Sequence, residues 1–536
     1  MLEYDKKIQE DSKDFVGDIN FVNGVGLNII KERSINADIS VYKKMIKFEN
    51  CICKLKIMEG NENAYATGFF CYIPSKELRV LITNNHVINK DFLNNKKELV
   101  IYIEEDEVEK QKIIYLDANR FKFTDESLNT TVIEILDEDL IDSYIEVDEE
   151  IIKDNEFINN SVFNLQFPQG GKMKASFGKI IESANGKTQF KYNAGTEAGS
   201  SGSPIILIKG HKIIGLDKGG SNTNNINNKI NLGVYLNNVI KLLPKSQENK
   251  NTIKCLYDIK SEDLNKDIKV YDNKFNFENN INSISVYKND EMNKFIKDGK
   301  LRFYKEGKYF ISYSINNSTR DLRDLFRQCK TLKRVYLPSF ADIKIENMSN
   351  MLFGCISLEK INFPRSFNTE NVTNMSNMLG FCESLENLNL TSFNTKNVVD
   401  MSHMFNGCES LNNVNLSSFN TENVKLMDNM FNGCHKLRDI DLSSFNTNNV
   451  TDFSSMFYDC ISLRKLNLSN FNFKNASRME NMLINCKSLV ELDLSSFETK
   501  DDVKTNDMFF GCKLLKKINN CTDKKILKAF ESIKSN

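Results

Sequence analysis

The chain has 536 residues, of which 40% are hydrophobic, and it carries 71 Lys and Arg against 72 Asp and Glu. This composition excludes a disordered chain, and the net charge of −1 gives no indication of a nucleic-acid partner. No apolar stretch reaches the roughly 18 residues of a transmembrane helix, and the length allows two or three domains.

An N-terminal extension, residues 1–44, opens with MLEYDKKIQEDSKDF and is charged from its first residues. It lacks the apolar core of a signal peptide, so we expect a cytoplasmic protein rather than a cell-surface one. The 13 cysteines are then expected to be reduced.

Residues 45–245 contain short runs rich in Ile, Val, Phe and Tyr, such as CICKLKI, ATGFFCYI and ELVIYIEE, which alternate with turns. Runs of this kind predict an all-β barrel or sandwich. Three motifs in this region carry candidate chemistry: LITNNHVI with His86, TVIEIL at 131–136, and TEAGSSGSPII with Ser201.

A serine nucleophile needs a base within hydrogen-bond reach, usually a histidine held by a third group. The chain has four histidines. His403 and His435 fall at variable positions of repeats, and His211 sits in KGHK, a predicted hairpin turn. His86 is therefore the candidate base for Ser201.

The ordered series TGFFCYIP, LITNNHVI, TVIEI, GSSGSPII and IIGLDKGG resembles a trypsin-like serine peptidase of the chymotrypsin clan, nearest to the glutamyl endopeptidases. The resemblance implies two packed β-barrels with the active site between them. It also implies that Ser201 is the nucleophile, that His86 is the general base, and that the N–H groups of Gly199 and Ser201 form an oxyanion hole. Glycine suits such a loop because it lets backbone amides turn inward.

The third catalytic position departs from this family. Aligning TVIEI puts Asn129 where the family has an aspartate, 43 residues after His86. A neutral amide cannot stabilise the imidazolium and can favour the wrong tautomer. Two alternatives remain open at this stage: a loop shift could bring the Asp125 carboxylate to His86, or Asn129 could orient His86 as the asparagine of cysteine peptidases does.

Substrate recognition is expected near the same motifs. The family resemblance assigns Thr196 and the position of Asp217 to the specificity pocket, and Gly219 and Gly220 to the strand that pairs with the substrate. An acidic Asp217 facing the pocket would favour Lys or Arg over Glu. The alternative is that Asp217 points to solvent or pairs with Lys218.

Residues 246–318 begin with a polar linker and continue with short β-like runs, which predict a small β-containing module of unassigned function. Residues 319–522 are a repeat array. Eight cysteines recur in it at intervals of 26 residues, with one interval of 27, and they are Cys329, Cys355, Cys382, Cys408, Cys434, Cys460, Cys486 and Cys512.

The repeat unit predicts a stacked solenoid. Its SLxxLxL piece predicts a short strand and its MSxMF piece one or two helical turns. We interpret the cysteines as small buried residues rather than metal ligands, because they lack close pairing. Asn394, Asn420 and Asn446 are expected to bond turn backbones along the stack.

The pattern MFxxCxSLxxLxLSSFNTxNVTxM resembles the BspA-like leucine-rich repeat of bacterial and protist surface proteins, which implies an extended surface for binding macromolecules. A C-terminal tail, residues 523–536, is expected to be helical. The expected fold is therefore multidomain: a chymotrypsin-like double barrel, the small β module and a leucine-rich-type solenoid.

The first functional hypothesis is a serine endopeptidase with reduced activity, acting through an acyl-enzyme, whose repeats bind a protein substrate or a trigger. The alternative is a weak or inactive peptidase-like scaffold that works as a protein-binding module, and a cell-surface adhesin is a third reading. No metal or organic cofactor, no nucleic acid and no membrane span are expected.

Overall fold

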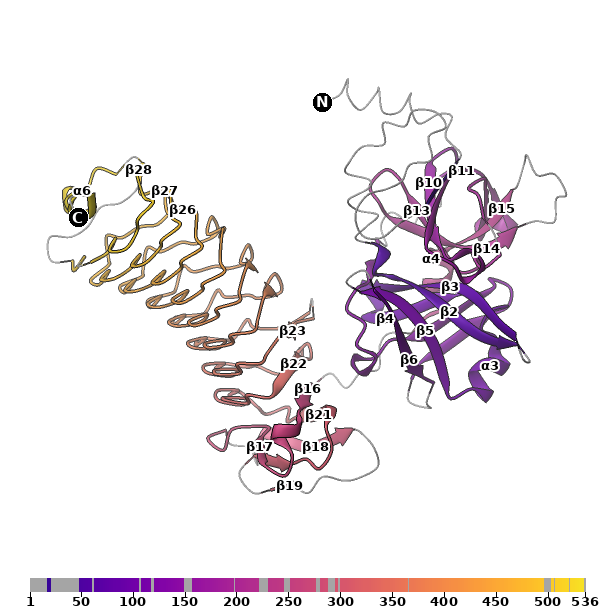
Figure 1. Cartoon of the computed structure of the whole chain (residues 1–536), viewed down its shortest axis with the longest axis horizontal. Helices are drawn as coiled ribbons and strands as arrows, with labels where there is room; N and C mark the ends of the chain where they lie inside the picture. The colour runs from indigo at the N-terminus through magenta and orange to yellow at the C-terminus, as the bar shows by residue number, and fades with distance from the viewer. Residues whose placement is uncertain are drawn as a thin grey trace. The chain divides into compact units, whose positions relative to one another are not determined.

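The computed structural model describes residues 17–20, 48–59, 62–105, 108–116, 120–148, 157–196, 198–220, 230–244, 251–275, 280–287, 295–296, 299–364, 366–495, 503–505, 507–519 and 521–534. The chain divides into two compact units, Met1–Gln247 and Glu248–Asn536. In both units the regular secondary structure is mainly β-strand (Figure 1).

The first sheet of the first unit has the strand order β6-β5-β2-β3-β4-β8-β7, with β9 parallel to β3. Its strands are β2 (Ile52–Glu59), β3 (Glu62–Ile73), β4 (Leu78–Thr83), β5 (Glu98–Glu105), β6 (Val108–Tyr115), β7 (Lys122–Asp125), β8 (Thr130–Glu134) and β9 (Ile145–Glu146), with helix α3 (Lys90–Asn95) between β4 and β5. The LITNNHVI and TVIEIL motifs supply β4 and β8, which pair antiparallel, so the residues after β4 and before β8 lie close together.

The second sheet is closed into a barrel, because β11 pairs with both β10 and β12. Its order is β1-β11-β10-β13-β14-β15-β12. The strands are β1 (Gly17–Asn20), β10 (Ser161–Gln166), β11 (Lys174–Ala184), β12 (Gln189–Tyr192), β13 (Pro204–Leu207), β14 (Ile213–Gly220) and β15 (Asn231–Tyr235), followed by helix α4 (Leu236–Leu242). The KGHK motif forms the β13–β14 hairpin connection, as predicted for His211.

One hydrophobic core joins the two sheets of this unit. Phe69 and Val80 of the first sheet and Phe163 and Ile205 of the barrel belong to the same buried cluster. Short 3-10 turns lie at the edges of the unit, at Pro74–Lys76, Asp137–Asp139, Pro168–Gly170 and Asn185–Lys187. Groups from distant parts of the sequence are thereby held in fixed positions where the two sheets meet.

The second unit begins with the small β module. Its sheets have the orders β18-β21-β16-β22-β23 and β17-β20-β19. The strands are β16 (Thr252–Ile259), β17 (Asp267–Lys269), β18 (Ile281–Tyr287), β19 (Phe295–Ile296), β20 (Lys300–Arg302) and β21 (Gly307–Ile315), with a 3-10 turn at Ser261–Asp263. Because β16 pairs with β22 of the first repeat, the module closes the open end of the repeat stack, as a capping element must.

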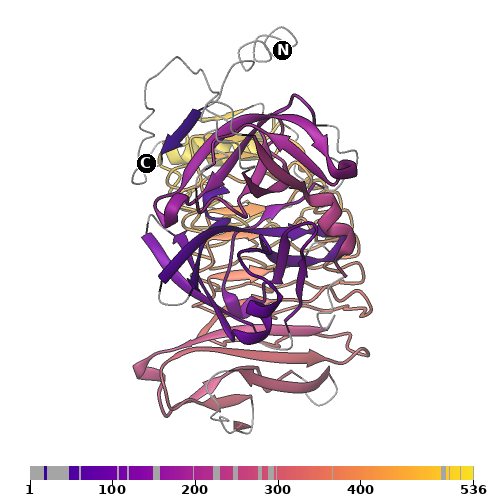
Figure 2. The same cartoon turned by 90° about the vertical axis from the view of Figure 1, so that its right-hand side faces the viewer.

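The repeats form a β-solenoid whose successive turns are seen in Figure 1 and, from the side, in Figure 2. Its short parallel strands are β22 (Leu332–Tyr336), β23 (Lys360–Asn362), β24 (Asn387–Asn389), β25 (Asn413–Asn415), β26 (Lys465–Asn467), β27 (Glu491–Asp493) and β28 (Lys517–Asn519). A continuous buried core runs from Ile253 to Phe530, and helix α6 (Lys524–Lys534) closes the stack through the contact of Phe530 with Phe509.

The SLxxLxL strand is confirmed, but the helical turns expected for MSxMF are wrong. His403 and its equivalents Asn377 and Asn429 have φ between 54° and 58°, a left-handed conformation that breaks an α-helix. The backbone N–H groups there bond the next turn instead, as His403 N does with Asp428 O at 2.9 Å. In the described part of the chain no helix is long and apolar enough to cross a bilayer.

The turn asparagines bond the backbone within their own turn. Asn420 Oδ1 accepts the Glu422 N–H at 3.0 Å, and Asn394 and Asn446 do the same two residues on. The bond along the stack is made by the asparagine backbone, since Asn420 N donates to Thr395 Oγ1 at 2.8 Å.

Candidate functional site

His86 and Asn129 contact each other in the first unit. His86 follows β4 and is exposed, and Asn129 precedes β8 with a φ of 47°. Asn129 Oδ1 accepts the His86 backbone N–H at 3.0 Å. The imidazole Nδ1 lies 2.8 Å from Asn129 Nδ2 and 3.1 Å from Oδ1. Asn129 is therefore the side chain that contacts and orients the His86 imidazole.

Two backbone groups fix the orientation of the Asn129 amide. Its Oδ1 receives the His86 N–H, and its Nδ2 donates to the Lys218 carbonyl at 3.3 Å. If the amide oxygen and nitrogen were exchanged, the NH2 group would face the His86 N–H and the oxygen would face the Lys218 carbonyl, so neither hydrogen bond could form. Because Nδ2 lies closer to His86 Nδ1 than Oδ1 does, this donor favours the imidazole tautomer that carries its proton on Nε2. A neutral His86 in that form cannot take a proton through Nε2.

Asp125 does not reach His86. Its Oδ1 accepts from Ser127 Oγ at 2.6 Å and from Leu128 N at 2.8 Å, so it stabilises the turn that leads to Asn129. The hydrogen bond from Ser127 is the main cause that lowers the pKa of the Asp125 carboxyl. The alternative in which Asp125 orients His86 is wrong in this structure.

Ser201 lies in the loop between β12 and β13, and it is half-buried. The φ values of Gly199 and Gly202 are 92° and 89°, which only glycine adopts without strain. A Cβ on Gly199 would lie 2.6 Å from the Phe167 carbonyl oxygen, and one on Gly202 would collide with the Thr67 carbonyl. Both glycines are required by the path of this loop.

The peptide planes before Gly199 and Ser201 are fixed by their carbonyls. Ala198 O accepts from Gln169 N at 2.6 Å, and Ser200 O accepts from Ser203 N at 2.9 Å. Because C=O and N–H point in opposite directions in a trans peptide, the N–H groups of Gly199 and Ser201 point away from these donors. Neither N–H donates to another group among the described residues. Both are available to stabilise an oxyanion.

Strand β14 is the common neighbour of the two candidate catalytic groups. Its Lys218 carbonyl bonds Asn129, and a Cβ on Gly219 would lie 4.0 Å from Ser201 Oγ. No hydrogen bond joins Ser201 Oγ to His86 among the contacts described. Gly220 ends β14 opposite Asn231, and Thr196 Oγ1 donates to Asn231 Oδ1 at 2.9 Å.

Asp217 is buried, with 1% of its surface exposed. Its Oδ1 accepts from the Tyr192 hydroxyl at 2.7 Å and from Gly219 N at 3.1 Å, while Oδ2 is buried and has no hydrogen-bond partner among the described residues. Burial raises the pKa of the Asp217 carboxyl to about 6. The alternative that Asp217 faces solvent or pairs with Lys218 is wrong, because Lys218 Nζ bonds Ser127 O.

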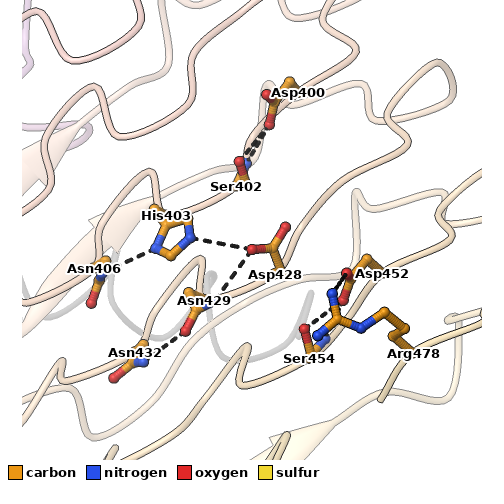
Figure 3. Close-up of polar contacts among 10 residues, drawn as sticks. All are labelled: Asp400, Ser402, His403, Asn406, Asp428, Asn429, Asn432, Asp452, Ser454 and Arg478. Atoms are coloured by element: carbon orange, nitrogen blue, oxygen red, sulfur yellow. Dashed lines mark hydrogen bonds and ion pairs between the residues drawn. The ribbon is translucent and has the colours of Figure 1, made fainter. Parts of the chain in front are cut away.

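Polar side chains in the solenoid join neighbouring turns rather than forming a catalytic group (Figure 3). His403 Nε2 lies 3.2 Å from Asp428 Oδ2, and Arg478 Nη1 lies 3.0 Å from Asp452 Oδ2. Asn406 Nδ2 lies 3.1 Å from His403 Nδ1, so both imidazole nitrogens are occupied. The His403–Asp428 and Arg478–Asp452 pairs each connect one turn with the next, whereas Asn406 and His403 belong to the same turn.

The cysteine column is buried, as expected, and it also supplies hydrogen-bond donors. From the second repeat on, each Sγ lies 3.0–3.3 Å from a carbonyl of the preceding turn. Burial raises the pKa of the Cys408 thiol to about 12, so it keeps its proton. Among the residues placed by the structure, no cluster of three or more His, Cys, Asp or Glu could hold a metal ion.

Comparison with known proteins gives a family only for the repeats. A model described as "Mycoplasma protein of unknown function, DUF285" matches residues 320–439 and 412–521. No leucine-rich or BspA-like family is among the matches. No curated protein matches the chain.

Solved structures similar to this chain are proteases. A serine endoprotease from Yersinia pestis is 13% identical with a TM-score of 0.30, and the match covers 39% of this chain and 66% of that one, just under two thirds. The inactive form of the Rv3671c protease from M. tuberculosis H37Rv is 16% identical, with a TM-score of 0.27 and coverage of 38% and 93%. The tobacco etch virus protease with its product is 14% identical, with a TM-score of 0.25 and coverage of 37% and 76%.

Several residues around the site carried no sequence signal. Thr67, Tyr192 and the Lys218 carbonyl contact candidate site residues that are 25 to 132 positions away in the chain. No short motif encodes such contacts, because strand pairing between distant segments creates them.

Proposed function

We propose that residues 45–245 form a chymotrypsin-like double barrel with serine endopeptidase activity, and that the solenoid of residues 319–522 binds a protein substrate or a trigger. The small module of residues 246–318 and the helical tail of residues 523–536 complete the proposed organisation. The Gly199 and Ser201 N–H groups, which donate to no acceptor among the described residues, support this reading most directly.

In the proposed reaction, Ser201 Oγ attacks the scissile carbonyl carbon and its proton passes to His86 Nε2. The two loop N–H groups stabilise the negative oxygen of the tetrahedral intermediate, a contribution of about 3–4 kcal/mol for each donor in comparable sites. His86 then gives the proton to the leaving amine, and water hydrolyses the acyl-enzyme ester.

Asn129 makes this reaction slow in the resting protein. Its amide favours the His86 tautomer with the proton on Nε2, the atom that must accept the Ser201 proton. Exchanging the amide oxygen and nitrogen would break the bonds to His86 N and Lys218 O, so the Nδ2 donor stays beside His86 Nδ1. We therefore expect weak activity rather than none, because the oxyanion donors and Ser201 remain in place.

The proposed specificity is for a basic side chain before the cleaved bond. Asp217 Oδ2 is a buried acceptor to which no group of the described residues donates, and its charge calls for a cationic partner. Thr196, Gly219 and Gly220 are the other proposed substrate-binding residues. A substrate Lys or Arg would supply the missing donor, whereas Glu would be repelled.

A fluorophosphonate probe tests the proposal, applied to wild type, Ser201→Ala and Asn129→Asp. We expect labelling that depends on Ser201 and becomes stronger in Asn129→Asp. No labelling of either wild type or Asn129→Asp, with circular dichroism showing both folded, would contradict the enzyme assignment.

The second candidate is a protein-binding scaffold in which the peptidase-like unit has lost its activity. Asn129 is the observation that favours it. The absence of labelling described above would make this candidate the better account.

A further inference from the structure

Thr67 lies in β3 at the junction of the two sheets of the first unit, and none of its surface is exposed. All of its polar groups are used. Its carbonyl accepts from Thr83 Oγ1 at 2.9 Å, which anchors it within the first sheet. Its remaining three hydrogen bonds go to the loops that surround Ser201.

Those three bonds cross from the first sheet to the barrel. Thr67 N donates to Ser201 O at 3.1 Å, and Thr67 Oγ1 donates to Gly199 O at 2.8 Å. The same hydroxyl accepts from Phe167 N at 3.0 Å, next to the turn whose Gln169 holds Ala198 O. One side chain thus acts as donor and acceptor at once.

Four successive carbonyls of the nucleophile loop are held as a result. Gln169 N donates a hydrogen bond to the Ala198 carbonyl, and Ser203 N donates one to the Ser200 carbonyl. Thr67 donates to the other two carbonyls, from its Oγ1 to that of Gly199 and from its N–H to that of Ser201. Since each peptide plane turns as a rigid body, fixing its carbonyl also fixes its N–H. Thr67 therefore limits rotation of the peptide plane between the two that present the oxyanion donors and of the plane that follows them.

We propose that Thr67 is a positioning residue, which holds the nucleophile loop in the geometry required for catalysis. The inference rests on the proposed function for its catalytic consequence, but the restraint on the loop stands on the hydrogen bonds alone. Through this restraint, the geometry of the nucleophile loop depends on a residue of the first sheet. The loop is therefore ordered only when the first sheet and the barrel are packed together.

The chemistry of threonine suits this role. Removing the hydroxyl in Thr67→Val keeps the shape but takes the hydrogen-bond partner from the part-buried Gly199 carbonyl and from the buried Phe167 N–H. Thr67→Ser retains both bonds. A β-branched residue is also restricted in χ1, which orders the hydroxyl before the loop closes on it.

Lys54 offers a matched control. It faces Thr67 across the β2–β3 pair and also crosses to the barrel, where its Nζ donates to Gly170 O at 3.2 Å. It lies over the rings of Tyr65, Tyr102 and Phe167 and pairs with Glu109. Among the described residues it makes no hydrogen bond, ion pair or ring contact with residues 198–201, so Lys54→Met weakens the junction without releasing the loop.

The first measurement is amide hydrogen exchange in the full chain at Gly202 and Ser203, the loop amides that donate to Asp217 O and Ser200 O. We expect Thr67→Val to increase exchange there about tenfold or more, while Thr67→Ser and Lys54→Met stay near wild type. Equal exchange in Thr67→Val and wild type would overturn the restraint, and equal acceleration in Lys54→Met would show a general loosening of the junction instead.

The second measurement uses the Asn129→Asp background and the fluorophosphonate probe. We expect Thr67→Val to lower the maximal labelling rate about 10- to 100-fold, with the half-saturating probe concentration unchanged and the rate rescued in Thr67→Ser. An unchanged maximal rate beside altered exchange would refute the catalytic role of the restraint. If the Asn129→Asp parent is not labelled at all, the proposed function fails, and the exchange result still decides whether Thr67 holds the loop.

Discussion

The two units of this protein use hydrogen bonds in opposite ways. In the first unit, polar contacts join residues 43, 89 and 132 positions apart, and each contact occurs once. In the solenoid, contacts recur at separations of 25 and 29 positions, and each is repeated in the next turn. One chain therefore combines a unit whose polar contacts are unique with a solenoid whose polar contacts are periodic.

This difference predicts different responses to substitution. A change at a unique contact in the first unit alters the chemistry of one site and leaves most of the core intact. A change in the solenoid removes one member of a stack whose stability is approximately a sum of repeat and interface terms. Substitutions in the first unit should therefore mainly change the reaction rate at the site. Substitutions in the solenoid should mainly change the free energy of unfolding of the second unit.

The largest effect is expected at Asn129. Asn129→Asp supplies an acceptor for the His86 Nδ1 proton and a charge for the imidazolium, so Nε2 becomes free to take the Ser201 proton. The second-order rate of fluorophosphonate labelling should rise about ten-thousand-fold, the size of the loss that the reverse exchange causes in a Ser-His-Asp peptidase.

Asn129→Leu is the control for this prediction, because it removes the amide donor without adding a carboxylate. Its labelling rate should stay within about tenfold of wild type. A gain as large as that of Asn129→Asp would mean that relief of the Asn129 contact, rather than the new charge, activates Ser201.

The next effect is on the stability of the solenoid. Phe431 is fully buried and stacks on Phe405 and Phe457, with ring centroids 5.3 and 5.6 Å apart. Phe431→Ala should lower the free energy of unfolding of the second unit by about 3–5 kcal/mol, measured by denaturant titration. Phe381, which is 40% exposed, is the matched control, and Phe381→Ala should cost about 0.5 kcal/mol. Equal losses would contradict the continuous buried stack.

The sequence predicted the solenoid better than the site, and the reason is physical. A fixed interval places equivalent residues in equivalent surroundings, so the burial of the cysteine column and the SLxxLxL strand followed from spacing. The MSxMF piece was misjudged as helical, because left-handed residues such as His403 let each turn bond the next one.

In the first unit, motif order was enough to bring Asn129 to His86. It could not predict how the amide is oriented, because two backbone groups, His86 N and Lys218 O, decide that. Nor could it predict the burial of Asp217, which depends on Tyr192 from a neighbouring part of the barrel. The sequence could not predict a contact of the site when one of its two partners is a backbone group or lies on a distant strand.

A smaller effect is expected from Asp217 through pH. Its folded-state pKa of about 6 exceeds the ordinary value of 3.8, so the folded state holds the proton more strongly than the unfolded one. Stability of the first unit should therefore fall as pH rises from about 4 to 6, by about 3 kcal/mol from this group. Asp217→Asn has no carboxyl to titrate at this position, so it lacks this pH-dependent contribution to stability.

The measurement is the free energy of unfolding of the first unit at pH 4 and pH 7 for wild type and Asp217→Asn. The difference between the two proteins should grow toward neutral pH in favour of Asn. A constant difference across this range would show that the Asp217 carboxyl titrates normally. A substrate with a basic residue before the cleaved bond should also lose its advantage in Asp217→Asn.

The smallest effect concerns the cysteine column and separates burial from hydrogen bonding. Cys434 Sγ lies 3.3 Å from Phe405 O, and the residue is fully buried. Cys434→Ala should destabilise the second unit by about 1 kcal/mol, because it removes both the apolar volume and the donor to a buried carbonyl. Cys434→Ser keeps a donor in a smaller, more polar group. If the thiol matters only as a small hydrophobe, serine should be the more damaging substitution, whereas comparable or smaller damage from serine would show that the donor to the preceding turn contributes to the stack.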